Sequence, residues 1–149
     1  MARLTLLRKY YDDYRPILLK VSPDLSEEQL DEIIELILVS GLDGIVATNT
    51  TITRDNLITE RAKVEVIGEG GLSGAPIFNR SLEMVRYISK KTGGQLPIIG
   101  VGGIMTPHQA KMMLDAGASL VQIYTGFMYN GPGFVRRILR YLNKQEQKC

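Results

Sequence analysis

Four short apolar runs, each followed by a small or polar turn, divide this chain of 149 residues. Stretches with helical spacing separate the runs, so the pattern indicates parallel strands that alternate with helices. We predict the strands at residues 16–21, 44–48, 97–101 and 120–124. The first of these runs is apolar at nearly every position, which is typical of parallel strands buried on both faces. The chain is therefore predicted to be α/β.

Capping signals place the helices between these strands. Ser26 can cap a first turn, with Gln29 at the reciprocal position of a capping box, and Gly41 suits the end of that helix. Thr106 and Pro107 form a second start signal. The apolar stripe of the first of these helices consists of Leu30, Ile33, Ile34 and Ile37. Further helices are predicted at residues 4–14, 79–91, 106–117 and 134–143.

The segment between the second predicted strand and the helix at 79–91 is long, and such loops in compact domains are usually functional or disordered. It contains the run Gly70-Gly71-Leu72-Ser73-Gly74. This run is either a plain flexible loop or part of a dinucleotide-binding fingerprint, which it partly resembles. A dinucleotide-binding fingerprint is rejected, because its last position is Ser73 and Glu69 would lie beside the pyrophosphate.

Composition excludes several functions. The 18 basic and 16 acidic residues give a net charge of +2 without a basic patch, so no nucleic-acid partner is expected. No apolar run approaches the length of a membrane span, and the N-terminus lacks a secretory apolar core. The single cysteine, Cys149, cannot form an internal disulfide or a metal cluster. We expect a soluble, cytoplasmic chain without a metal site.

Glycine-rich turns end the last two predicted strands. The run Gly100-Val101-Gly102-Gly103 follows one strand, and Tyr124-Thr125-Gly126 follows the other. In many (β/α)8 barrels the loops after strands seven and eight bind phosphate. Gly102, Gly103 and Thr125 are therefore predicted to converge on one anion. The inner barrel face is predicted to carry Leu18, Ile45, Ile99 and Val121.

Two further groups can carry chemistry. Lys20 is a charged residue inside an apolar strand and requires compensation, either from an ion pair or by reaching solvent, or from an anionic ligand. The run Thr48-Asn49-Thr50-Thr51 is either a hydrogen-bonded turn or a set of donors and acceptors for a planar polar ligand. Both alternatives stay open for both groups.

Taken together, five segments resemble the C-terminal half of dihydroorotate dehydrogenase, of the membrane-associated, quinone-using class. They stand in the family's order across nearly the whole chain. The segments are residues 19–25 (LKVSPDL), 43–51 (DGIVATNTT), 70–74 (GGLSG), 97–104 (PIIGVGGI) and 117–127 (GASLVQIYTGF).

The resemblance implies the C-terminal half of a (β/α)8 TIM barrel over residues 1–149, with about four parallel βα units. It implies FMN as cofactor and oxidation of dihydroorotate to orotate in de novo pyrimidine synthesis, with a quinone as electron acceptor. The flavin contacts would be Lys20, Thr48, Ser73, Gly74, Gly102, Gly103, Tyr124 and Thr125. The substrate contacts would be Asn49 and Thr50.

The family's catalytic base, a serine, would lie in the N-terminal half, as would the membrane-associating helices that place the complete enzyme on the cytoplasmic membrane. No catalytic residue is therefore expected in this chain, and the isolated chain is expected to be inactive. A complete barrel requires roughly 250 residues.

Exposed strand edges and an uncovered apolar face would drive self-association of such a half-barrel. A half-barrel that only binds phosphate or itself is the main alternative, while Lys20 with Asn49, Thr50 and Thr51 argues against a phosphate-binding lyase or isomerase.

Overall fold

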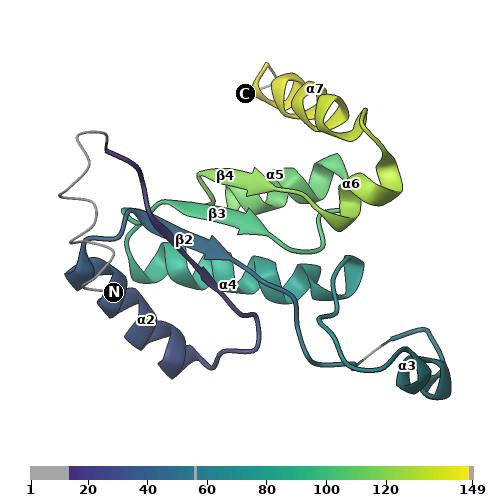
Figure 1. The fold of residues 1–149 in the computed structure, drawn as a ribbon. Coiled ribbons are helices and arrows are strands. Elements are labelled where there is room, and N and C mark those ends of the chain that lie inside the picture. The colour runs from purple at the N-terminus through teal and green to yellow at the C-terminus, as the bar shows by residue number, and fades with distance from the viewer. Residues whose placement is uncertain (1–13, 56, 148–149) are drawn as a thin grey trace.

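The computed structural model describes residues 14–55 and 57–147. One parallel sheet, with the strand order β1-β2-β3-β4, forms its centre (Figure 1). The four predicted strands are confirmed, each slightly shorter than expected. Their bounds are β1 (Leu18–Val21), β2 (Gly44–Ala47), β3 (Ile98–Val101) and β4 (Leu120–Gln122).

Helices follow every strand, and four of the predicted helices are present. These are α2 (Glu27–Ser40), α4 (Phe78–Lys91), α5 (Pro107–Asp115) and α7 (Phe134–Glu146). Sequence patterns missed three short elements, namely α3 (Arg61–Ile67), the 3₁₀ turn η1 (Ala75–Ile77) and α6 (Thr125–Asn130). The helix predicted at 4–14 lies outside the described residues apart from Tyr14. Within residues 14–55 and 57–147, no helix is both long and apolar enough to cross a membrane.

The predicted caps of α2 and α5 are present. The Gln29 backbone N–H donates to the Ser26 hydroxyl at 3.2 Å, and the Gln29 side chain accepts from the Ser26 N–H at 3.0 Å. Gly41 ends α2 in the left-handed conformation, with φ of 69°. Thr106 and Gln109 form a second capping box, with Pro107 at the first position of α5. These caps fix where each helix begins, and thus where each βα loop ends.

The sheet has two different faces. On the covered face, Val21, Ile45, Ala47 and Ile98 are all less than 4% exposed and form one core with α2, α4 and α5. The open face carries the residues that alternate with them. In register these are Lys20 beside Val46, Val46 beside Ile99, and Ile99 beside Leu120. Leu120 is 62% exposed and Lys20 is also exposed, so no helix of the described chain covers this face.

This register corrects the predicted inner face. Leu18 and Ile99 lie on the open face as expected, but Ile45 and Val121 do not. Ile45 pairs with Ile98 and Val121 pairs with Gly100, so both lie on the covered face. A side chain at Gly100 would contact Met113 of α5 at 3.4 Å, which fixes the direction of that face. The prediction was wrong because successive strand residues alternate between the two faces.

Candidate functional site

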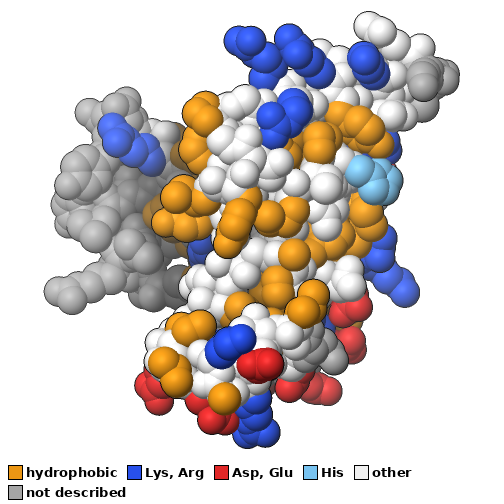
Figure 2. All heavy atoms as spheres, turned by 90° about the vertical axis from the view of Figure 1, so that its right-hand side faces the viewer, with side chains coloured by type: hydrophobic (Ala, Val, Ile, Leu, Met, Phe, Trp, Pro, Cys, Tyr) orange, Lys and Arg blue, Asp and Glu red, His pale blue; other side chains and the backbone are white. Residues whose placement is uncertain are grey.

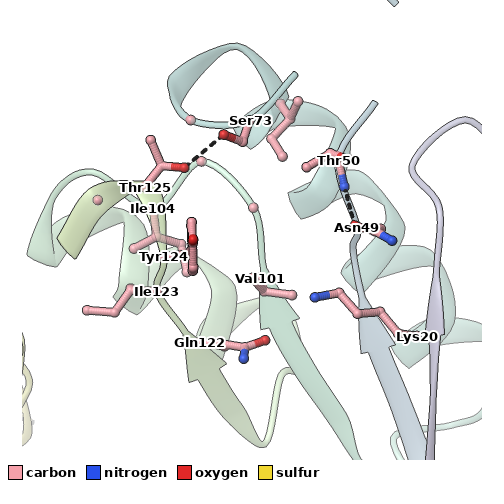
Figure 3. Close-up of a pocket in the computed structure, with 15 residues that line it drawn as sticks. Lys20, Asn49, Thr50, Ser73, Val101, Ile104, Gln122, Ile123, Tyr124 and Thr125 are labelled. Atoms are coloured by element: carbon pink, nitrogen blue, oxygen red, sulfur yellow. Dashed lines mark hydrogen bonds between the residues drawn. The ribbon is translucent and has the colours of Figure 1, made fainter. Parts of the chain in front are cut away.

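A hollow lies at the carboxyl ends of the strands, where the predicted site residues come together (Figure 3). Its cavity volume of about 240 Å³ is smaller than the roughly 300–1,000 Å³ of pockets that enclose a whole ligand. Every predicted site residue except Thr48 lines it. The lining residues are Lys20, Asn49, Thr50, Ser73, Gly74, Ile77, Val101, Gly102, Gly103, Ile104, Gln122, Ile123, Tyr124, Thr125 and Gly126.

Lys20 gives this hollow its charge. The side chain comes from the open face of β1 and reaches toward the hollow (Figure 3). No Asp or Glu is among the described lining residues, and Lys20 forms no ion pair within the described chain. Its ammonium group therefore reaches solvent at the mouth of the hollow. An anionic ligand is the natural partner for a cation held among neutral groups.

Glycines shape one end of the hollow by allowing close packing on α4. A Cβ at Gly103 would lie 2.6 Å from the backbone of Phe78, and a Cβ at Gly102 would lie 2.2 Å from the Ser81 hydroxyl. Both residues have positive φ, 124° at Gly102 and 69° at Gly103. The loop after β3 therefore rests on the start of α4 and presents bare backbone to the hollow, as an anion site requires.

The same end is closed by a contact between two loops. The Thr125 hydroxyl donates to the Ser73 hydroxyl at 2.9 Å, which joins the start of α6 to the glycine-rich loop (Figure 3). Gly74, with φ of 84°, permits this approach, because a Cβ there would lie 3.1 Å from the Thr125 methyl carbon. Small polar groups from separate loops thus surround one side of the hollow.

Asn49 and Thr50 lie at the other end. The Asn49 N–H donates to the carbonyl of Val21 at 2.7 Å, and the Asn49 side-chain oxygen accepts from the Thr50 N–H at 2.9 Å. Thr50 rests against Gly71, where any Cβ would lie 2.0 Å from the Thr50 hydroxyl. The predicted hydrogen-bonded turn is present, and it also lines the hollow. The structural and functional interpretations of this segment are therefore compatible.

Thr48 is placed differently from the other predicted residues. It is 2% exposed, and its hydroxyl lies 2.9 Å from the Ser81 hydroxyl of α4 and donates to the Asn49 carbonyl. The peptide bond between Ala47 and Thr48 is cis. Because the hydroxyl is engaged within the protein, a flavin contact by Thr48 stays a prediction without support from the lining of the hollow.

Gln122 is a lining residue that sequence reasoning missed. It is exposed at the end of β4 and pairs with Val101 in register. A polar residue within an otherwise apolar strand marks the open face, as Lys20 does on β1, and could have identified it. Among residues 14–55 and 57–147, no three His, Cys, Asp or Glu side chains gather as metal ligands.

The strand ends face one side of the molecule, which Figure 2 views directly. Hydrophobic side chains spread across the middle of this side, while basic ones gather at the top, over α7. Near the hollow, α6 contributes exposed Met128 and Tyr129, at 72% and 81%. The surroundings of the hollow are thus apolar and aromatic rather than charged.

A sequence profile of the dihydroorotate dehydrogenase family matches residues 3–145, almost the whole chain. The chain belongs to the dihydroorotate dehydrogenase family. It is 53% identical over 127 residues to the dihydroorotate dehydrogenase (quinone) of Nocardia farcinica, covering 85% of this chain and 34% of that protein. With the dihydroorotate dehydrogenase (quinone) of Rhodococcus opacus it shares 50% identity over 145 residues, covering 97% of this chain and 41% of that protein.

Solved dihydroorotate dehydrogenase structures show the same fold. The crystal structure of DHODH from Eimeria tenella in complex with ferulenol matches with a TM-score of 0.80 at 37% identity, over 91% of this chain and 36% of that one. The chain thus corresponds to part of the barrel of these enzymes. It spans 34% to 41% of the length of the curated relatives described above.

Proposed function

We propose that this chain supplies the flavin-binding part of a dihydroorotate dehydrogenase that oxidises dihydroorotate to orotate in de novo pyrimidine synthesis. The observation that carries the proposal is the gathering of Lys20, the glycine loops and Asn49-Thr50 around one hollow in a chain of this family. The relatives are dihydroorotate dehydrogenases of the quinone type, which supports quinone as the electron acceptor of the complete protein. Dihydroorotate and quinone are its proposed partners.

The residues present fit FMN. Gly102 and Gly103 offer bare backbone to a phosphate, and Ser73, Gly74 and Thr125 surround the same end. Tyr124, which is 79% exposed beside them, adds an aromatic wall. Bound FMN would supply the group that accepts a hydride from the substrate. Lys20 would stabilise the negative charge that the N1–C2 edge of the ring carries after reduction, because it is the charged lining residue of the described hollow.

Asn49 and Thr50 would bind the substrate where they line the hollow. An amide both donates and accepts, which suits the amide-like edges of dihydroorotate and orotate. We assign no catalytic base to these residues. The base, the quinone site and the contact with the cytoplasmic membrane are assigned to sequence beyond them, so this chain by itself is proposed to be inactive and to bind only part of its ligands.

Flavin titration tests the proposal. We expect the chain to bind FMN saturably, measured by quenching of flavin fluorescence, and to bind riboflavin at least about tenfold more weakly because riboflavin lacks the phosphate. Thr125→Val should weaken FMN binding, since it removes a hydroxyl that lies at the phosphate end beside Ser73. Equal affinity for FMN and riboflavin would contradict the assignment of the phosphate end.

The response of bound flavin to dihydroorotate distinguishes this function from that of a half-barrel that only binds phosphate. Dihydroorotate should bleach the flavin absorbance of a complete protein that contains this chain, and should leave the isolated chain with FMN unchanged. Competition by inorganic phosphate without any effect of orotate would favour the phosphate-only alternative. Steady turnover by the isolated chain would refute its proposed inactivity.

We also propose that the isolated chain self-associates. The open face exposes Leu120, and β1 and β4 are both free edges of the described sheet. Because all four strands are parallel, a twofold rotation about an axis along the strands would place β4 of one copy beside β1 of the next in the same direction. Two copies would thereby cover each other's open face.

A further inference from the structure

A second set of contacts lies just behind Asn49 and Thr50, outside the hollow. Asp24, in the loop between β1 and α2, accepts hydrogen bonds from the Thr51 hydroxyl and from the backbone N–H of Ile52, the latter at 3.0 Å. The Ser22 hydroxyl donates to the same carboxylate at 3.3 Å. One exposed side chain therefore fixes a loop more than 25 residues away in sequence.

Thr51 passes this constraint on to the glycine-rich loop. Its N–H donates to the Leu72 carbonyl at 3.1 Å, and the Leu72 N–H donates to the Thr51 carbonyl at 2.8 Å. Thr51 is 5% exposed, so its hydroxyl needs an internal partner, which Asp24 provides. Thr51 thus connects Asp24 to both segments that meet at the hollow, Asn49-Thr50 on one side and Gly71–Gly74 on the other.

Arg80 binds the loop between β1 and α2 that contains Asp24. Its guanidinium donates to the carbonyl of Pro23 at 2.9 Å and to the carbonyl of Leu25 at 2.7 Å, the two residues that flank Asp24. Because Arg80 belongs to α4, the loop is fixed to the helix on which Gly102 and Gly103 also rest. We call Asp24, Thr51 and Arg80 the Asp24 clamp.

We propose that Asp24 is a positioning residue, which orders the Asn49-Thr50 turn and the glycine-rich loop so that they face the hollow together. The inference deepens the proposed function and rests on it, because Asn49 and Thr50 are there assigned to the substrate. Asp24 itself does not line the hollow. Its carboxylate is at the surface, where single polar contacts contribute little to global stability, so its effect is local order.

Hydrogen exchange measures this order without any need for activity. In Asp24→Ala we expect exchange at the Thr51 and Leu72 amides to accelerate by about one to two orders of magnitude, because hydrogen bonds to a charged acceptor are lost. Thr51→Val should have the same effect, and Thr51→Ser should retain protection. The double variant Asp24→Ala with Thr51→Val should accelerate exchange by less than the product of the two single effects, because both variants remove the bond between Asp24 and Thr51.

Asp31→Ala is the matched control. The Asp31 carboxylate also joins two distant elements, accepting from Tyr87 at 2.8 Å and from Lys91 at 2.6 Å, but it lies between α2 and α4 rather than at the loops. The Asp31→Ala variant should leave hydrogen exchange at the Thr51 and Leu72 amides unchanged. Equal protection of these amides in Asp24→Ala and in the unaltered chain would overturn the proposal. If Asp24→Ala does not fold, hydrogen exchange in Thr51→Val tests the proposal in the same way.

Kinetics then test the functional consequence in a complete, FMN-loaded protein that contains this chain. We expect Asp24→Ala to raise KM for dihydroorotate about tenfold with FMN content unchanged, and Asp31→Ala to leave KM unchanged. Accelerated exchange with an unaltered KM would refute the positioning role. A protein that shows the exchange effect but no dihydroorotate oxidation in any form would refute the proposed function and leave the structural part of the clamp intact.

Discussion

The two faces of the sheet are made from the same strands but differ in how far their residues are buried. On the covered face, Ile45 and Ile98 are completely buried against helices. On the open face, the neighbouring positions are Lys20, Val46, Ile99 and Leu120, of which Lys20 and Leu120 are exposed. The apolar strand residues with no exposed surface, Ile45, Ala47 and Ile98, therefore all lie on the covered face, where their burial contributes to the folding free energy.

Because of this difference, neighbouring residues of one strand serve different purposes. Those on the covered face mainly stabilise the fold, and those on the open face are available for function. A residue on the covered face has its full set of packing partners in this chain. An exposed residue on the open face, such as Leu120, gains further partners only from a ligand, from another copy or from further sequence. Substitutions one position apart should therefore have different consequences, and this expectation can be tested by matched pairs.

The largest effect is expected from Ile98→Ala compared with Ile99→Ala. Ile98 is completely buried, so its truncation should lower the free energy of unfolding by about 2–5 kcal/mol, measured by urea denaturation. Ile99 is only partly buried on the open face, so its truncation should cost clearly less. Equal losses for the two variants would mean that the open face is covered in solution.

Lys20→Ala tests the function of the open face. In a complete, FMN-loaded protein we expect the rate of flavin reduction by dihydroorotate to fall about a hundredfold or more, as when a preorganised electrostatic group is removed. Rapid mixing measures this rate, and the melting temperature should hardly change. Lys90→Ala, on the exposed side of α4, is the control and should not affect reduction. An unchanged rate in Lys20→Ala would show that Lys20 is structural.

Self-association should depend on the open face and not on exposed apolar residues in general. Leu120 on β4 and Leu38 on α2 are 62% and 60% exposed, which makes them a matched pair. We expect Leu120→Lys to weaken assembly of the isolated chain by about tenfold or more, and Leu38→Lys to leave it unchanged. Sedimentation equilibrium measures both. A monodisperse monomer of the unaltered chain would refute self-association altogether.

The smallest effect we expect is the pH dependence of the stability that Asp31 contributes between α2 and α4, the helices on the covered face. Hydrogen bonds from Lys91 and Tyr87 hold the pKa of Asp31 below its usual value of 3.8. A carboxyl with a lowered folded-state pKa stabilises the protein above its unfolded value, and this contribution is lost as the pH falls through the folded value. The difference in free energy of unfolding between the unaltered chain and Asp31→Asn should therefore be constant near neutral pH and shrink below about pH 4. A difference that grows on acidification would contradict this sign.

The sequence predicts local structure well where a residue has a local physical role. Ser26 with Gln29, Thr106, and Gly41 fix helix ends through bonds to nearby backbone, so their patterns identified α2 and α5. By contrast, α3 has no buried residue and α6 is only six residues long, so neither has an apolar stripe to detect.

The strand faces could not be assigned from apolar positions, because the strands are apolar on both sides. Ile45 and Val121 were placed on the wrong face for this reason, whereas the polar residues Lys20 and Gln122 marked the correct one. The gathering of the site residues was predictable from motif resemblance. The bond between Thr48 and Ser81 and the role of Asp24 were not, since each depends on contacts between residues more than 25 positions apart.

The contact of Gly103 with Phe78 has a consequence for how such a site changes over evolutionary time. Any side chain at Gly103 would have to displace the backbone of α4, which also carries buried Leu82, Val85 and Ile88. The glycine end of the hollow can therefore hardly diverge without rebuilding the core. Asn49 and Thr50 line the hollow with side chains rather than bare backbone, so new ligand preferences should arise there first.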